Sequence, residues 1–327
     1  MAAMQMIAVN GNAEVISVEN FSDTTIAGFI ASRHCSENTA RTYRNSIRQL
    51  LKFFAAEGIT APTTADADAY INTLRANGKS DATLRLYTTT MKLFFGYLEK
   101  HGVYRNVTSE MENLHLRKSS THNKKALTGS QAQKLLSAVK GDSLIALRDK
   151  AIIALALTCG LRTCEISRAK VGNFQDCGDY WTLAVQGKGS QVADETVKVA
   201  PVVAQMINAY LDKRGNVGDA QPLFTSTSNN TTWKKNRYGS RLSEQSVGKL
   251  IARYMKVAGI KSKAISAHSC RHYAAQTAIE SGVDIREVKS MFRHHSLNTT
   301  LIYIEDLALK KRRAEMAVAA SLFGVAA

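Results

Sequence analysis

The chain is poor in cysteine, and its cysteines are not paired along the sequence. Five cysteines occur in 327 residues, and no two of them form a C-x-x-C pair. An odd number without such a pair argues against a disulfide framework and against a structural zinc site. We therefore expect reduced thiols, as in a cytosolic protein.

Long hydrophobic runs are also absent. The longest apolar stretch, residues 151–161, is far shorter than the ~20 residues that a membrane-spanning helix needs. Residues 1–15 lack a basic segment followed by an apolar core, so we expect no secretory signal. We find neither an internal repeat nor a low-complexity segment. These absences predict a cytoplasmic protein that does not contact a membrane.

Acidic residues are scarce relative to basic ones. The chain holds 27 acidic and 43 basic residues, which gives a net charge of +16. Such an excess favours a polyanionic partner, most often nucleic acid. The alternative is a merely basic soluble protein, because net charge bears on association and not on fold. An apolar content of 45% is sufficient for hydrophobic cores, and the length suggests two domains.

The first half of the chain has helical periodicity. After a loose arm over residues 1–21, apolar spacing predicts helices over 38–56, from Thr63 or Thr64 to Leu74, and over 80–100, within a bundle of about four helices at 22–103. Six basic residues of this bundle are candidate contacts for DNA phosphates: Arg41, Arg44, Arg48 and Lys52 on one stripe, and Arg85 and Lys92 on another helix. Each could equally belong to a solvated helix face.

Residues 104–125 lose this periodicity, and 115–125 are polar and basic. We interpret 104–125 as a linker between domains. It is either a solvated tether or a basic tether that lies along DNA.

A second domain is predicted over residues 126–327. Helices are expected over 127–139, 143–157 and 243–257, and the second of these is apolar on nearly every side. Alternation predicts strands over 180–185 and 196–199, joined by a hairpin loop that carries Lys188. Residues 213–241 are polar and predict a long surface loop, and a final helix is expected over 306–323. The predicted fold is mainly α-helical with a small antiparallel sheet.

Six residues of this half form a set suited to chemistry on a phosphodiester: Arg162, Lys188, His268, Arg271, His294 and Tyr303. Arginines hold phosphate oxygens with forked donors. A lysine can protonate a leaving oxygen, a histidine can accept a proton, and a tyrosine can attack the phosphorus. Taken singly, each residue has an ordinary structural interpretation. His294–His295 lacks an acidic or cysteine partner at ligand spacing, so we expect no metal site.

The order and spacing of these residues resemble those of the tyrosine recombinases, the phage integrase family that includes the Xer and Cre recombinases. The family strings TGLR-x-SE, GKG, H-x-LRH and LGH-S read here as CGLRTCE, GKG, HSCRH and FRHH, and Tyr303 follows His294 by nine residues. Cysteines replace the usual residues at 159, 164 and 270, and Phe292-Arg293 replaces Leu-Gly. The sequence does not explain Arg293, which could touch a phosphate or face solvent.

The resemblance implies a helical, SAM-like core-binding domain followed by a mixed α/β catalytic domain. It implies that Tyr303 cleaves DNA through a 3′-phosphotyrosine, with Arg162 and Arg271 on the non-bridging oxygens and Lys188 as the acid. His268 would accept the tyrosine proton or hold the phosphate, His294 would bind a phosphate oxygen, and Glu165 would support the site from behind. No cofactor is implied.

The implied partner is double-stranded DNA with paired recombination sites, in the bacterial cytoplasm. The protein would be a monomer when free and a homotetramer on DNA, with the C-terminal helix docked on a neighbouring protomer. Strand exchange would pass through a Holliday junction and serve integration, inversion or dimer resolution. Two alternatives remain: a type IB topoisomerase-like nicking-closing enzyme, and a non-catalytic DNA-binding protein.

Overall fold

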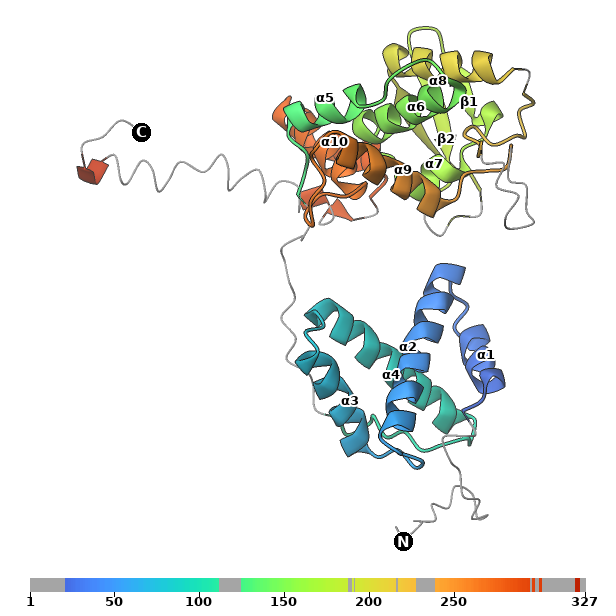
Figure 1. Ribbon diagram of the computed structural model, residues 1–327, viewed down its shortest axis with the longest axis vertical. Coiled ribbons are helices and arrows are strands. Elements are labelled where there is room, and N and C mark those ends of the chain that lie inside the picture. Colours follow the sequence, from blue (N-terminus) through green and yellow to red (C-terminus); the bar gives the residue numbers. More distant parts are fainter. Residues whose placement is uncertain are drawn as a thin grey trace. The chain divides into compact units, whose positions relative to one another are not determined.

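The computed structural model describes residues 21–111, 125–187, 190, 192–215, 217–227, 239–294, 296–297, 300–301 and 321–323. They belong to two compact units, with the division between Thr121 and His122 (Figure 1). Lys188 and Tyr303 lie outside the described residues, as do His295, the arm over residues 1–20 and most of the tail predicted as a helix.

The first unit is built from four helices within residues 21–111: α1 (Asp23–Ser32), α2 (Glu37–Ala56), α3 (Thr64–Ala76) and α4 (Asp81–Lys100) (Figure 1). Each begins after a serine or threonine whose side chain accepts a hydrogen bond from a backbone N–H of the first turn. This satisfies a donor that the helix itself leaves unpaired. The predicted bundle of about four helices is confirmed.

The core of this unit follows from the spacing of apolar residues on α2 and α4. Ile47, Leu50 and Phe54 recur every three or four residues along α2 and are buried, whereas Tyr43 and Leu51 on the same helix are partly buried. The α2 helix packs against α4, which in turn contacts α3. Two apolar stripes therefore close on one another, as the sequence predicts.

Several residues at the edges of the first unit contribute to its core. Phe21 makes edge-to-face contacts with Phe94 and Phe95 of α4. Tyr104 is buried, and its hydroxyl donates a hydrogen bond to the Pro62 carbonyl over 3.0 Å. Val107 and Met111 are buried as well. Residues at both ends of the predicted bundle, which the sequence places in the arm and in the linker, thus pack as part of this unit.

The second unit contains the remaining elements: α5 (Gly129–Ser137), α6 (Leu144–Thr158), α7 (Thr163–Arg168), the 3-10 helix η2 (Val171–Asn173), β1 (Phe174–Asp176), β2 (Trp181–Val185), β3 (Glu195–Val199), α8 (Pro201–Arg214), α9 (Glu244–Val257), α10 (His268–Glu280) and α11 (Ile285–Phe292). The α6 helix contacts α5, α8, α9 and α10 (Figure 1). Its residues 151–157 are all buried. The helix predicted to be apolar on nearly every side is therefore the central element of this unit.

The sheet of the second unit is antiparallel and has the strand order β1-β2-β3 in the part of the chain that the structure describes. Phe174 of β1 faces Leu183 of β2, and Val185 of β2 faces Glu195 of β3. The predicted strands on either side of Lys188 pair with each other as β2 and β3, and Lys188 itself lies outside the described residues. The fold is thus mainly helical with a small antiparallel sheet, in agreement with the sequence.

The surface loop predicted over residues 213–241 is only partly correct. The α8 helix continues to Arg214, and Leu223 and Phe224 are fully buried in the main core. Short backbone bridges join Lys170 to Pro222 and Thr225 to Arg241. Because the residues around Leu223 and Phe224 are polar, the sequence pattern did not predict that this apolar pair is buried. Two further elements, the three-residue strand β1 and the helix α8, were not predicted from the sequence.

None of the helices within the described residues has the length and apolar character needed to cross a membrane.

Candidate active site

The turn between α6 and α7 presents Arg162. This residue is the N-cap of α7 and has extended backbone angles, so it separates the buried α6 from α7. Its Nη1 donates to Glu165 Oε1 over 2.7 Å, and its backbone N–H donates to Glu165 Oε2 over 2.7 Å. Glu165 is fully buried, while the Arg162 side chain keeps 27% of its surface exposed. The carboxylate therefore holds Arg162 from behind and leaves it accessible in front.

Gly160 allows this turn to approach α10 and α11 closely. Its φ is +57°, a conformation that residues with a Cβ rarely adopt. A Cβ at this position would lie 2.6 Å from the Phe292 ring. The Gly160 carbonyl accepts a hydrogen bond from Arg271 Nη1 over 2.5 Å. Glycine is required here for both backbone angle and space.

Arg271, in the first turn of α10, is buried and held by main-chain oxygens. Besides its bond to Gly160, its Nη2 donates to the Phe292 carbonyl over 2.5 Å and lies 3.1 Å from His294 Nε2. Its guanidinium also stacks 4.4 Å from the centroid of the Phe292 ring. The arginine thus joins the α6–α7 turn, α10 and the end of α11.

His294 follows α11 and is buried beside Arg271. Burial, together with the positive charges of Arg271, Arg162 and Arg293, lowers the pKa of His294 to about 4. The ring is therefore neutral at pH 7. Arginine only donates, so His294 Nε2 is the acceptor and Nδ1–H donates to Thr300 Oγ1 over 2.9 Å. A hydroxyl can donate as well as accept, so Thr300 also suits the opposite tautomer.

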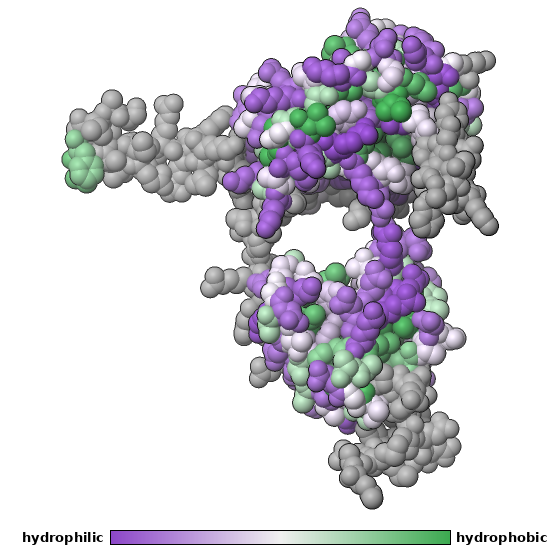
Figure 2. Space-filling view, viewed as in Figure 1, coloured by the Kyte–Doolittle hydropathy of each residue, from purple (hydrophilic) through white to green (hydrophobic). Residues whose placement is uncertain are grey.

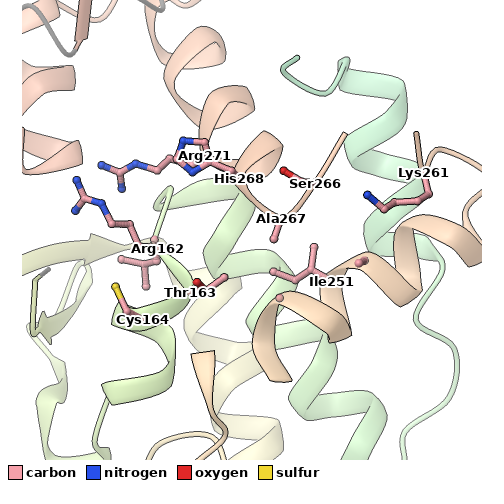
Figure 3. A pocket seen from close by; sticks show the side chains of 12 residues that line it. Arg162, Thr163, Cys164, Ile251, Lys261, Ser266, Ala267, His268 and Arg271 are labelled. Atoms are coloured by element: carbon pink, nitrogen blue, oxygen red, sulfur yellow. The ribbon is translucent and has the colours of Figure 1, made fainter. Parts of the chain in front are cut away.

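A pocket of about 570 Å³ lies in front of these groups and is lined by Arg162, His268 and Arg271. Figure 3 shows the guanidinium ends of Arg162 and Arg271 on the same side of this pocket, with His268 beside Arg271. His268 is exposed, and its ring stacks edge-on against His272 with the centroids 4.8 Å apart. Lys261, at the far end of the pocket, donates to the Ile265 carbonyl. Two guanidiniums and an imidazole at one opening suit an oxyanion such as phosphate.

The structure corrects one interpretation of Arg293. Its side chain is only 4% exposed, so the residue does not face solvent. Nη2 forms an ion pair with Glu165 Oε2 over 2.6 Å, and Nε lies 3.5 Å from Glu195 Oε2. These pairs could not be predicted from the sequence, because 128 residues separate Arg293 from Glu165.

The cysteines near this site are not reactive groups. All five cysteines are free thiols. Burial raises the pKa of Cys159 and Cys164, and it raises that of Cys270 to about 12. Protonated thiols are poor nucleophiles, so we assign these residues to packing.

Of the six residues predicted for the site, the structure brings together Arg162, Arg271, His268 and His294. Lys188 and Tyr303 lie outside the described residues. Within the described residues, no group of three or more histidine, cysteine or acidic side chains could hold a metal ion.

The predicted basic stripe of the first unit is largely at its surface. Arg41, Arg48 and Lys52 are exposed, and Arg44 is partly exposed. Arg48 lies 3.3 Å from Asp23 on α1, an exposed pair of small energetic value. On α4, Arg85 is exposed and Lys92 partly so. Figure 2 shows hydrophilic side chains over the region where Figure 1 places α1 and α2.

Comparison with known families agrees with this fold. Residues 125–309, more than half of the chain, match the model of the phage integrase family. Residues 26–102 match its N-terminal SAM-like domain. These two matches define an enzyme of DNA recombination. The chain belongs to the phage integrase family of tyrosine recombinases, which cleave and rejoin DNA.

Similar proteins extend over most of the chain. Tyrosine recombinase XerA of Pyrococcus furiosus is 30% identical over 268 residues, which cover 82% of this chain and 83% of the relative. Tyrosine recombinase XerD of Xanthomonas axonopodis pv. citri is 30% identical over 306 residues, covering 89% and 93%. A solved structure of the XerH site-specific recombinase bound to a palindromic difH substrate has a TM-score of 0.68 and 19% identity, and the match covers 91% of this chain and 84% of that one. This last likeness concerns the fold.

Proposed function

We propose that this site-specific recombinase opens DNA with Tyr303 as its nucleophile. The phenolic oxygen attacks the scissile phosphorus, the bond from phosphorus to the 5′-oxygen breaks, and a 3′-phosphotyrosine forms. The 5′-hydroxyl of another strand then attacks this phosphotyrosine and releases the tyrosine. One phosphodiester replaces another at each step, so the reaction needs neither ATP nor a metal ion. The observation that carries this proposal is the convergence of Arg162, Arg271 and His268 on one opening, with His294 3.1 Å from Arg271.

The two arginines bind the non-bridging phosphate oxygens. Arg271 is immobilised by main-chain carbonyls and Arg162 by Glu165, so their positive charge is in place before DNA arrives. Preorganised charge stabilises the pentacoordinate transition state without a cost of reorganisation. His294 donates a hydrogen bond to a phosphate oxygen once its Nε2 carries the proton. The Thr300 hydroxyl supports that tautomer by donating to Nδ1.

Two proton transfers accompany the attack. A free tyrosine has a pKa of about 10 and is a poor nucleophile at neutral pH. His268, exposed at the start of α10, accepts the phenolic proton. Lys188, on the hairpin between β2 and β3, protonates the departing 5′-oxygen, which would otherwise leave as an unstable alkoxide.

The two units divide the work of binding and chemistry. We infer a core-binding domain over residues 21–111 and a catalytic domain from about residue 125 onward, with the intervening chain as the linker. The arginines and lysines on α2 and α4 contact phosphates and position the duplex without reading its sequence. The substrate is double-stranded DNA with paired sites in the bacterial cytoplasm, and four protomers assemble on two sites. A lambda integrase tetramer bound to a Holliday junction has this fold and supports the proposal.

Covalent capture tests this proposal. The wild-type protein is incubated with a library of nicked double-stranded fragments in excess chelator, and denaturation-resistant protein–DNA adducts are isolated and sequenced. We expect adducts at a defined sequence, and strand exchange between two copies of that sequence. Loss of adducts in chelator with recovery in magnesium would contradict the metal-free mechanism.

Two variants complete this experiment. Tyr303→Phe should abolish the adduct and leave DNA binding within about twofold, because only the nucleophilic oxygen is lost. Tyr180→Phe is the matched control, since Tyr180 lies at the surface of the same unit. An adduct formed by Tyr303→Phe would refute the assignment of the nucleophile.

A further inference from the structure

Arg293 is the C-cap residue of α11, and its backbone conformation is one that favours glycine. It ends α11 with φ +53° and ψ +48°, in the left-handed region. Among the described residues, His34 is the other non-glycine residue with positive φ. A side chain in this conformation is strained, and the strings of the family carry glycine here. An arginine at this corner is expected to provide contacts that offset the strain.

The contacts of Arg293 all lie within the second unit. Nη1 donates to the Met291 carbonyl over 2.6 Å, Nη2 donates to Glu165 Oε2 over 2.6 Å, and Nε faces Glu195 Oε2 at 3.5 Å. The two Nη atoms thus donate hydrogen bonds to protein oxygens, whereas buried Nε makes only the longer ion-pair contact with Glu195 and no hydrogen bond. The side chain is almost fully buried. This geometry argues against a direct contact between Arg293 and DNA phosphate.

The contact with Glu165 bears directly on Arg162. The Glu165 carboxylate is buried and is shared, with Oε1 on the Arg162 guanidinium and Oε2 on both the Arg162 backbone and Arg293. A carboxylate between two guanidiniums is neutralised from both sides. Without Arg293, the full negative charge of Glu165 would act on Arg162. The two side chains would then favour a bidentate ion pair, which draws the Arg162 guanidinium away from the pocket.

The contact with Glu195 bears on the β2–β3 hairpin. Glu195 begins β3 and pairs in register with Val185, so it stands at the base of the loop that carries Lys188. A Cβ on Gly187 would lie 3.1 Å from Glu195 Oε2, so the start of the loop lies close to the carboxylate at its end. Arg293 therefore reaches the base of this hairpin, the Arg162 turn and the corner before His294.

We propose that Arg293 is a positioning residue for strand cleavage, which fixes Arg162 through Glu165 and anchors the base of the Lys188 hairpin through Glu195. The proposal rests on the roles assigned above to Arg162, Lys188 and Tyr303. It assigns to Arg293 a place behind the phosphate-binding groups and no contact with DNA.

Single-turnover cleavage of a suicide substrate by the full chain tests this role. Arg293→Gly removes the guanidinium and relieves the strained corner, so a defect cannot come from the backbone angle. We expect the rate constant for adduct formation at saturating DNA to fall roughly tenfold to a hundredfold, because small misplacements of catalytic groups have effects of this size. The DNA dissociation constant should change less than about twofold. Arg293→Lys keeps the charge without the fork and should be intermediate.

Two further variants isolate the cause. Arg286→Gln removes an exposed arginine from the same helix and should leave the rate constant unchanged. In a Glu165→Gln background, Arg293→Gly should have a smaller effect than in the wild type, because the two residues act through one contact. A purely structural role would lower the melting temperature and the fraction of active protein but leave the rate constant of the active molecules unchanged.

The outcomes separate this proposal from the proposed function. A wild-type protein that forms no adduct would overturn the function and, with it, the step that Arg293 supports. A normal wild-type rate with an unaffected Arg293→Gly variant would overturn only the role of Arg293. Weaker DNA binding with an unchanged rate at saturation would also overturn it, since that result identifies a phosphate contact.

Discussion

At the scale of single residues, main-chain atoms fix the site as much as side chains do. Arg271 is held by the carbonyls of Gly160 and Phe292, so its position depends on the path of two turns. Such an arrangement tolerates changes in neighbouring side chains but not changes in backbone angle. Gly160 is the residue at which this dependence can be measured.

We predict that Gly160→Ala destabilises the second unit by roughly 2–4 kcal/mol, from left-handed strain and from collision with the Phe292 ring. Urea unfolding followed by circular dichroism measures the effect. Gly129→Ala is the control, because its φ is ordinary and a Cβ there meets nothing within 4 Å. Equal stability of the two variants would disprove the steric argument.

We predict that His294 makes the second unit sensitive to acid. Its pKa is about 4 in the folded protein and about 6.5 in an unfolded chain, so the unfolded state binds the proton first as the pH falls. The stability associated with neutral His294 is complete above about pH 6.5. It is lost towards pH 4, by up to roughly 1.4 kcal/mol per pH unit.

The measurement is urea unfolding of the wild type and of His294→Asn at several pH values. The difference between the two proteins cancels the other titrating groups that they share. It should change between pH 6.5 and 4 and be flat above pH 7. Parallel curves over the whole range would mean that His294 ionises normally.

At the scale of elements, a buried carboxylate of α6 joins this helix to α9 through hydrogen bonds. Asp149 is fully buried, and its Oδ1 accepts hydrogen bonds from Arg148 over 2.9 and 2.7 Å. Its Oδ2 accepts from Arg253 and from the Tyr254 hydroxyl on α9, over 2.8 and 3.1 Å. The central helix α6 is therefore held by apolar packing and also by a buried network in which both oxygens of Asp149 accept hydrogen bonds.

Asp149→Asn should lower the unfolding free energy of the second unit by roughly 3–5 kcal/mol, because it leaves buried donors without their charged acceptor. Thermal or urea unfolding measures the loss. Asp142→Asn, at an exposed position before α6, should change stability by no more than about 0.5 kcal/mol. Similar effects of the two substitutions would show that the network contributes little.

The sequence predicts most elements of this fold, because helix spacing and capping residues act locally. Ser80 and Ser243 begin α4 and α9, as the sequence indicates. Leu223 and Phe224 escaped prediction, since their burial depends on helices distant in the chain. Arg162, Arg271 and His294 were predicted from their resemblance to the recombinase motifs, but the position of Arg293 was not. Its partners belong to two other elements, and only tertiary structure brings them together.

At the scale of the whole molecule, the C-terminal segment bears on assembly. The helix predicted over residues 306–323 lies outside the described residues except for 321–323, where Leu322 and Phe323 are exposed. Apolar residues that are not buried within their own chain favour contact with another chain. The resemblance to the tyrosine recombinases implies that this segment docks on the next protomer.

We therefore predict that deleting the residues after Asp306 preserves binding to a single DNA site but weakens assembly on paired sites. Cleavage should also change, because Tyr303 precedes the cut closely. Gel-shift titrations with one and with two sites measure assembly, and a melting curve of the DNA-free protein measures stability. A lower melting temperature with unchanged assembly per folded molecule would show that the segment folds back on its own domain.

Arg293 and its two carboxylate partners constrain how this sequence can evolve. Replacing Arg293 alone leaves Glu165 and Glu195 without their shared cation, and replacing Glu195 alone removes one of the two carboxylates that hold Arg293. Substitutions at positions 195 and 293 are therefore expected to be coupled, so that the effect of changing both differs from the sum of the two single effects.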